Sequence, residues 1–339
     1  MKRRPFRAWT TRSMRIGRAP RFKPISLKEH QIWENQFHEL NTYDETCLIS
    51  ETLISLFGMG RLGGFVRIIR PVNALMLGLG VLVGVVITGG LTSMIPLFYL
   101  ALAFVTGFTM TGSAMAVNDY YDREIDAVNE PGRPIPSGSV KPGEALALSA
   151  FLSIIGLAAA WVTSLECFGV ALFAWLVMMV YSSWGKRTGF PGNLMVSTCI
   201  ALPFIYGGLL TSNTRSALLF SLLAFLSNTG REVTKGIIDV EGDRKESVRT
   251  LAVSLGPRMA SYAAVFFYLS AVFASVFPLY LGLVSIWYVP FVLVTDLGLI
   301  HGSIVLLREP SRENSRRVKN RVLYWMLTGL LAFAAGGLI

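Results

Sequence analysis

Long apolar segments alternate with polar connections along most of the chain. A helix that crosses a hydrocarbon layer about 30 Å thick needs about 20 residues. This pattern predicts an all-α integral membrane protein with nine transmembrane helices, at 65–90, 95–117, 144–163, 167–184, 194–211, 216–234, 259–281, 284–307 and 321–339.

The composition agrees with a membrane protein and argues against a soluble enzyme. Hydrophobic residues make up 53% of the chain and charged residues only 15%, against about 45–50% and about 25% in soluble domains. The three cysteines, Cys47, Cys167 and Cys199, lie far apart and form no CxxC pair. Neither a disulfide framework nor a zinc site is indicated.

Positive charge predicts the orientation, because Lys and Arg mark the cytoplasmic side of a membrane protein. With the N-terminus inside, the nine-helix topology places 30 of the 31 Lys and Arg residues on the cytoplasmic face, and only Arg215 falls outside. Orientation therefore accounts for the net charge of +10, and no nucleic-acid partner is predicted.

The first 60 residues differ from the rest. Residues 1–28 contain ten Lys or Arg and no acidic residue, with no apolar core of signal-peptide form behind them. We expect two regions: a basic cytoplasmic arm at 1–60, partly disordered, and a membrane domain at 61–339. An organellar targeting segment is the alternative interpretation of the arm.

Five of the seven aspartates fall in two clusters. The first follows the second predicted helix. On a continuous helix, Asn118, Asp119, Asp122 and Asp126 lie within an arc of about 100°. Several carboxylates on one helix face at a membrane boundary require a compensating charge.

The second cluster follows the sixth predicted helix. Arg231, Lys235, Asp239 and Asp243 recur every fourth residue, which predicts one stripe with two cations below two anions. Local ion pairing is the simpler explanation for either cluster alone. Two such clusters on one predicted face favour a shared function, the binding of a diphosphate through Mg²⁺, which prefers oxygen ligands and completes its shell with phosphates.

Basic residues near the clusters are candidates for phosphate contacts. Arg133 lies in the segment NEPGRPIPSG, whose prolines and glycines predict a stiff, non-helical loop. Lys186 and Arg187 follow the fourth predicted helix, and both residue types bind phosphate oxygens.

The two clusters also resemble a known family. NDYYDREID at 118–126 resembles the NDxxDxxxD pattern of the UbiA superfamily of intramembrane prenyltransferases, and DVEGD at 239–243 resembles its second motif, DxxxD. The likeness runs over about 65–339, through YSSWGKRTGFPGN, ALPFIYGG and GREVTKGIIDVEGDRK. The second half is most similar to the archaeal geranylgeranylglycerol-phosphate geranylgeranyltransferases, or digeranylgeranylglyceryl phosphate synthases.

This resemblance implies a UbiA-like fold, with nine helices around a laterally open central cavity and a cytoplasmic cap formed by the two motif loops. It implies Mg²⁺ as cofactor, membrane lipids as surroundings, and transfer of a geranylgeranyl group from geranylgeranyl diphosphate to the hydroxyl of an isoprenoid acceptor lipid, geranylgeranylglyceryl phosphate. The implied catalytic residues are Asp122, Asp126, Asp239 and Asp243. The implied metal-binding residues are Asn118, Asp119, Asp122, Asp126, Asp239 and Asp243. The implied substrate-binding residues are Asn73, Arg133, Lys186, Arg187, Arg231 and Lys235.

Several alternatives remain. A chlorophyll synthase or a quinone-precursor prenyltransferase would share the superfamily's motifs, and an ion-coupled transporter would also use membrane carboxylates. The clusters lie at the predicted membrane boundary, which favours the enzyme. No general base stands out: we expect Asp296 and His301 to form a buried polar contact that fixes helix packing.

Overall fold

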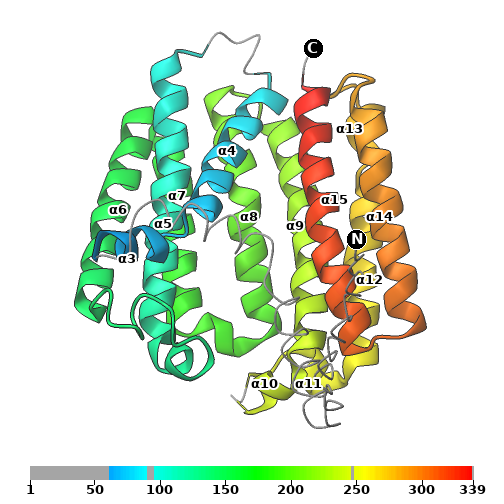
Figure 1. The fold of residues 1–339 in the computed structure, drawn as a ribbon. Coiled ribbons are helices and arrows are strands. Elements are labelled where there is room, and N and C mark those ends of the chain that lie inside the picture. Colours follow the sequence, from blue (N-terminus) through cyan, green and yellow to red (C-terminus); the bar gives the residue numbers. More distant parts are fainter. Residues whose placement is uncertain (1–60, 90–94, 246–247, 338–339) are drawn as a thin grey trace, which may run out of the picture. The chain divides into compact units, whose positions relative to one another are not determined.

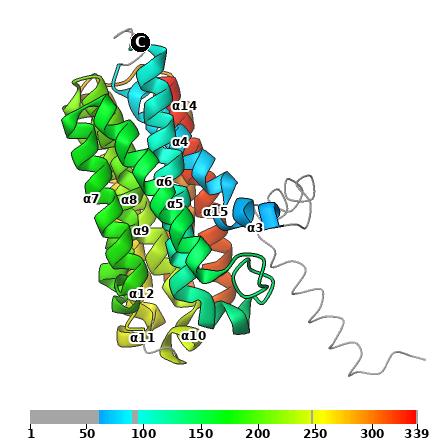
Figure 2. The same cartoon turned by 90° about the vertical axis from the view of Figure 1, so that its left-hand side faces the viewer.

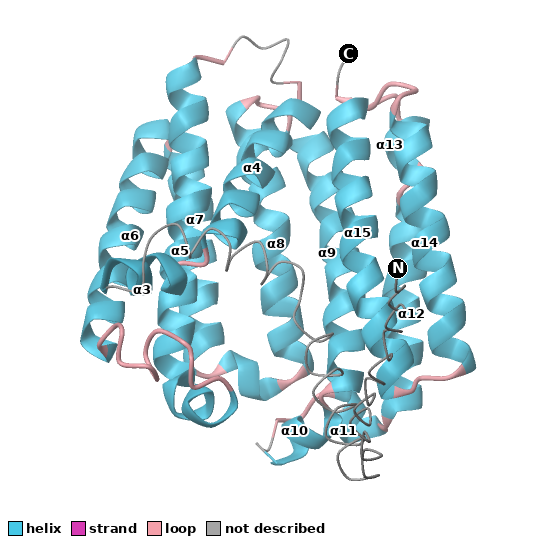
Figure 3. Cartoon of the chain, in the orientation of Figure 1, coloured by secondary structure: helices cyan, strands magenta, loops and turns pink. Residues whose placement is uncertain are grey.

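The structure, a computed structural model, describes residues 61–89, 95–245 and 248–337, and these residues contain helices and no strand (Figure 3). The predicted arm at 1–60 lies outside the described residues. The helices are α3 (Arg61–Ile68), α4 (Pro71–Ile87), α5 (Leu97–Asn129), α6 (Pro142–Thr163), α7 (Leu165–Ser183), η1 (Gly185–Thr188), α8 (Phe190–Leu210), α9 (Thr214–Ile238), α10 (Val240–Lys245), α11 (Leu251–Leu255), α12 (Pro257–Ala274), α13 (Phe277–Tyr280), α14 (Tyr288–Arg308) and α15 (Arg312–Gly336).

The predicted transmembrane segments fall on long helices of the described part, but fewer than predicted meet the requirements of a span. Six helices there are long and apolar enough to cross a membrane, and α3 with α4, bent by 43°, would make a seventh. Both α9 and α15 have 25 residues but do not qualify, since polar and charged residues interrupt them. The chain is an integral multi-pass membrane protein, and a count of nine spans stays a prediction.

The helices pack both with their neighbours in sequence and with distant helices. The most extensive contacts join α5 to α6, α8 to α9, and α14 to α15, while α9 also packs against α12 and α15. In turn, α4 contacts both α5 and α8. Figure 1 accordingly has α9 in the interior of the bundle, between α8 and α15.

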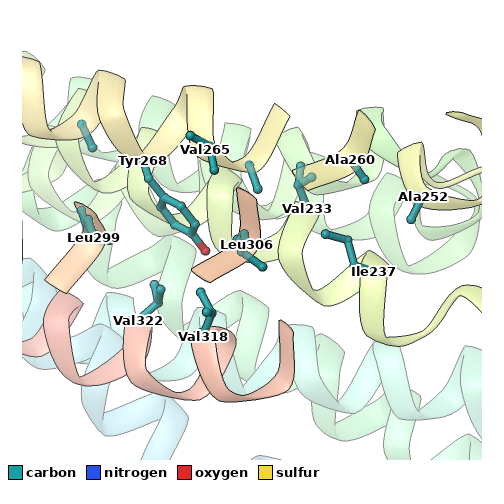
Figure 4. Packing of buried hydrophobic residues seen from close by; sticks show 12 residues of the cluster. Val233, Ile237, Ala252, Ala260, Val265, Tyr268, Leu299, Leu306, Val318 and Val322 are labelled. Carbon is teal, nitrogen blue, oxygen red and sulfur yellow. The ribbon is translucent and has the colours of Figure 1, made fainter. Parts of the chain in front are cut away.

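A buried apolar cluster fixes α9 against α12, α14 and α15 (Figure 4). The ring of Tyr268 packs so closely on Gly230 that a Cβ atom there would lie 2.6 Å from it. The Tyr268 hydroxyl is also 2.9 Å from Oγ1 of Thr234. These contacts on one face of α9 orient its polar residues toward the opposite face.

Hydrogen bonds between side chains hold α5 in place. The hydroxyl of Ser113 on α5 lies 2.8 Å from that of Ser149 and 2.7 Å from that of Ser153, both on α6. Trp175 on α7 donates its indole N–H to Ser153 at 2.9 Å. Small hydroxyl residues allow close approach of helices and link them within an apolar surrounding, so the acidic end of α5 projects from a fixed helix.

One expected contact is absent. Asp296 accepts a hydrogen bond from Ser275 on α12 at 2.7 Å, whereas the side chain of His301 is exposed. The predicted Asp296–His301 contact was wrong, because residues five apart on a helix lie about 140° from each other around its axis.

The chain segments that carry the two aspartate clusters lie at the same end of the bundle. The C-terminal end of α5, the turn η1, and the short helices α10 and α11 all lie at the lower end in Figure 1, and Figure 2 shows the same end from the side. The fold therefore brings together segments more than one hundred residues apart in sequence.

Candidate active site

The first cluster lies on α5, which continues as a helix through Asn129 and so keeps the expected common face. The side-chain amide of Asn118 donates to Oδ2 of Asp122 at 2.8 Å, one turn away. Oδ1 of the same carboxylate is ion-paired with Lys186 of η1. Both oxygens of Asp122 therefore face an N–H donor.

The other two aspartates of α5 are paired with arginines. Asp119 is only 3% exposed, and its Oδ1 accepts from Arg70 at 2.6 Å and lies 3.7 Å from Arg133. Arg133 also donates to Asp126 at 2.7 Å and to Glu130 at 2.6 Å. Each aspartate of this motif thus has a basic partner, and Arg133 joins two of them.

Arg133 keeps its charge despite its partial burial. Burial acts to lower its pKa, but the hydrogen bond to Glu130 and the charges of Asp126 and Asp119 outweigh this, so the pKa lies above the ordinary value of arginine. The guanidinium is therefore cationic at all relevant pH values.

The loop that carries Arg133 is folded on itself, as its prolines and glycines predict. The backbone N–H of Val140 donates to the carbonyl of Pro134 at 3.0 Å, and Gly138 takes a positive φ of 74°. Helix α3 packs on this loop: Arg67 donates to the carbonyl of Gly132 at 2.8 Å. Because the loop is already rigid, Arg133 loses little conformational entropy when a ligand binds.

The second cluster differs from the predicted continuous stripe. Helix α9 ends at Ile238, Asp239 caps it, and α10 begins at Val240. The backbone N–H of Asp243 still donates to the carbonyl of Asp239 at 2.8 Å. A helical turn therefore joins the two aspartates, although α9 and α10 are separate helices. Asp239 forms no ion pair with a described residue.

Arg231 and Lys235 of α9 pair with a residue that the sequence analysis missed. Glu232 is 8% exposed. Its Oε1 accepts from Arg231 at 3.1 Å, and its Oε2 lies 3.9 Å from Nζ of Lys235. The sequence does contain a signal for Glu232: it is a carboxylate in a mostly apolar helix, next to one cation and three residues before another.

Tyr181, near the end of α7, lies within electrostatic range of charged groups on two other helices. These groups are Lys235 and Glu232 of α9 and Asp122 of α5. Arg70 and Tyr181 were both missed from the sequence, because their roles depend on contacts between distant segments.

Two predicted substrate-binding residues have no such contacts. Asn73 on α4 is partly buried and Arg187 in η1 is exposed, and neither side chain is hydrogen-bonded to a described residue. Both stay predictions.

The acidic side chains of the site suit a divalent metal only in part. No group of three His, Cys, Asp or Glu residues converges tightly enough, among the described residues, to hold an ion by itself. Magnesium usually takes one or two carboxylates and fills its shell with water and phosphate oxygens. The paired aspartates fit a Mg²⁺ ion that is bound together with a phosphorylated ligand.

These observations define a helical membrane protein with acidic and basic side chains concentrated at one end. The chain belongs to the UbiA prenyltransferase family, whose model matches residues 74–331.

Two comparisons refine this assignment. The chain is 35% identical, over 80% of its length and 95% of the relative's, to the digeranylgeranylglyceryl phosphate synthase of Methanothermobacter thermautotrophicus. A solved structure of digeranylgeranylglyceryl phosphate synthase is similar with a TM-score of 0.73 and 30% identity, covering 82% of this chain and 98% of that one.

A third comparison supports the fold. A UbiA homologue from Archaeoglobus fulgidus bound to DMAPP and Mg²⁺ has a TM-score of 0.54 at 18% identity, covering 80% of this chain and 97% of that one.

Proposed function

We propose that the chain transfers a geranylgeranyl group from geranylgeranyl diphosphate to the hydroxyl of geranylgeranylglyceryl phosphate and releases diphosphate. The observation that carries this proposal is the position of both aspartate segments at the same end of the bundle, where basic side chains also pair with Asp122 and Asp126. The synthase name of relatives at 30% identity or more supports the choice of substrates.

The donor diphosphate would bind at the aspartate clusters together with Mg²⁺. The residues that would hold the metal are Asn118, Asp119, Asp122, Asp126, Asp239 and Asp243. Magnesium supplies Lewis-acid neutralisation of the diphosphate charge. The homologue that binds DMAPP and Mg²⁺ on the same fold supports this requirement.

Basic side chains stabilise the leaving group. Arg133 and Lys186 already lie against Asp126 and Asp122, where they can donate to non-bridging oxygens of a diphosphate. Negative charge on those oxygens grows as the allylic C–O bond breaks, so the interaction strengthens toward the transition state.

The acceptor reacts without a dedicated base. Its hydroxyl oxygen forms the new C–O bond as the bond to diphosphate breaks, and the hydroxyl proton passes to the released diphosphate. A developing carbocation lowers the need for a strong base, and His301, the one histidine among the described residues, is exposed and remote in sequence from both clusters.

The site faces the cytoplasm in this proposal. Lys186, Arg133, Arg231 and Lys235 belong to segments that also carry most of the positive charge outside residues 1–60, as expected for the cytoplasmic side.

Product formation by the purified protein in detergent tests the function. The donor is geranylgeranyl diphosphate with Mg²⁺, and the acceptor is geranylgeranylglyceryl phosphate, chlorophyllide or a quinone precursor in separate reactions. We expect the digeranylgeranyl product with the first acceptor alone. Transfer to chlorophyllide or to the quinone precursor instead would reassign the chain within the family, and ion flux in proteoliposomes without any prenyl transfer would favour a transporter.

A further inference from the structure

Three charged side chains on α9, here called the α9 trio, lie directly before the second aspartate motif. The trio consists of Arg231, Glu232 and Lys235. Its two cations share one buried carboxylate, at 3.1 Å and 3.9 Å, so it carries one positive charge in excess. On α5, by contrast, Arg70, Arg133 and Lys186 each contact an aspartate of the first cluster directly.

The donor atoms of the trio are not all used. Nε of Arg231 is buried and has no hydrogen-bond partner, although a buried donor without an acceptor is costly. From Glu232 to Ile238 every residue is buried except Lys235, whose side chain is 52% exposed. One face of this helical turn is therefore accessible, and it presents an ammonium group.

The accessible face of α9 lies away from its packed face. Tyr181 interacts electrostatically with Lys235 and Glu232, and also with Asp122 across the site. The opposite face of α9 is occupied by Tyr268 and the apolar cluster around it (Figure 4). A ligand at Lys235 would thus lie on the face of α9 that the apolar cluster leaves open.

We infer that the α9 trio is the binding site for the phosphate monoester of the acceptor lipid, which rests on the proposed function. A phosphate monoester carries about −1.5 to −2 charges at pH 7, and the trio offers an excess cation, an accessible ammonium and an unpaired guanidinium N–H. The donor diphosphate is assigned to Arg133 and Lys186, which already contact aspartates of α5.

Glu232 acts here as a positioning residue. Its carboxylate holds Arg231 and Lys235 about one helical turn apart on the accessible face. An anion between two cations also prevents their mutual repulsion when no phosphate is bound. We expect its removal to weaken acceptor binding through the geometry of the two cations.

Steady-state kinetics of Lys235→Gln and Glu232→Gln test the assignment, with each substrate varied separately. Loss of a hydrogen bond to a charged group corresponds to about 10- to 100-fold in binding. We expect the KM for geranylgeranylglyceryl phosphate to rise by about this factor in Lys235→Gln, while the KM for geranylgeranyl diphosphate changes less than about threefold. Lys235→Arg should restore most of the loss.

A dephosphorylated acceptor, geranylgeranylglycerol, provides a second measurement that does not depend on protein yield. The unaltered protein should strongly prefer the phosphorylated acceptor, and Lys235→Gln should lose this preference. Arg215→Gln is the matched control, since Arg215 is exposed near the other end of the same helix, and it should leave both KM values unchanged.

The outcomes separate the two proposals. A rise in the KM for the donor, with the acceptor KM unchanged, would place the trio in the diphosphate site and overturn the inference. Equal preference for both acceptors in the unaltered protein would also overturn it. No transfer to either glyceryl acceptor by the unaltered protein would refute the proposed function itself.

Discussion

The two aspartate clusters share a spacing of four residues but differ in how their charges are balanced. On α5, the carboxylates of Asp119, Asp122 and Asp126 are each held by a cation from a loop or another helix. At the end of α9, Asp239 has no ion pair with a described residue, and the cations upstream of it pair with Glu232 instead. The α5 cluster is held in place before a ligand arrives.

This difference indicates what binding has to change. A Mg²⁺ ion at Asp122 would compete with Lys186 for the charge of this carboxylate, since the ammonium group is already paired with it. A diphosphate offers Lys186 a new anionic partner at the same time. Metal and diphosphate are therefore expected to bind α5 together, while at Asp239 no ion pair with a described residue would have to be broken.

The largest expected effect comes from removing one charge at either cluster. Asp122→Asn and Asp239→Asn should each lower kcat by at least about 10²- to 10³-fold, the range found when a group that stabilises transition-state charge is lost. Product formation at saturating substrate measures this. Asp296→Asn is the matched control, because the amide keeps an acceptor for Ser275, and its rate should stay within about twofold.

Equal rates in Asp122→Asn and the unaltered protein would contradict a role of the α5 cluster in the reaction. A loss in Asp122→Asn alone would show that the two clusters do not act on one diphosphate.

The next effect sharpens the comparison directly. Lys186→Met should reduce kcat/KM for the donor by about 10- to 100-fold, because a charged hydrogen bond to diphosphate is lost. The same change should strengthen metal binding in the absence of substrate, because Asp122 is released. Mn²⁺, which accepts the same oxygen ligands, can be titrated by electron paramagnetic resonance without donor or acceptor.

Arg312→Met serves as control, since Arg312 is exposed at the start of α15. Metal binding by Lys186→Met that is unchanged or weaker than in the unaltered protein would contradict the proposed competition between lysine and metal.

Much of the α5 cluster could be predicted from the sequence, and much of the α9 end could not. The four-residue spacing of Asn118 and Asp122 is a local property of a helix, and their contact follows from it. The stiff loop around Arg133 likewise follows from its prolines and glycine. The same spacing failed at Asp239, where the helix ends.

Contacts between distant segments could not be predicted from the sequence. The pairing of Arg70 with Asp119 joins residues 49 positions apart, and no spacing rule connects them. The position of Glu232 on α9 could not be interpreted from the sequence, because the packing of Tyr268 and its apolar neighbours decides which face of α9 is buried. Packing between helices, more than local propensity, therefore decides how the site is completed.

The smallest expected effect concerns the turn that lies between the clusters. Gly189, at the end of η1, has a φ of 72°, and a Cβ atom there would lie 2.0 Å from the backbone oxygen of Arg249, just after the second cluster. Gly189→Ala must displace one of these two segments. We expect a loss of about 1 to 3 kcal/mol in stability from backbone strain and, in addition, a fall in turnover of up to about tenfold.

Gly256→Ala separates the two causes, because Gly256 has a φ of 86° and open space around it. It should show the strain, measured as a lower thermal midpoint, without the loss of turnover. Equal turnover in both variants would mean that contact between η1 and the segment after α10 is not needed to align Lys186 with the second cluster. A larger loss in Gly189→Ala would instead establish that the two differently balanced clusters depend on a single shared turn.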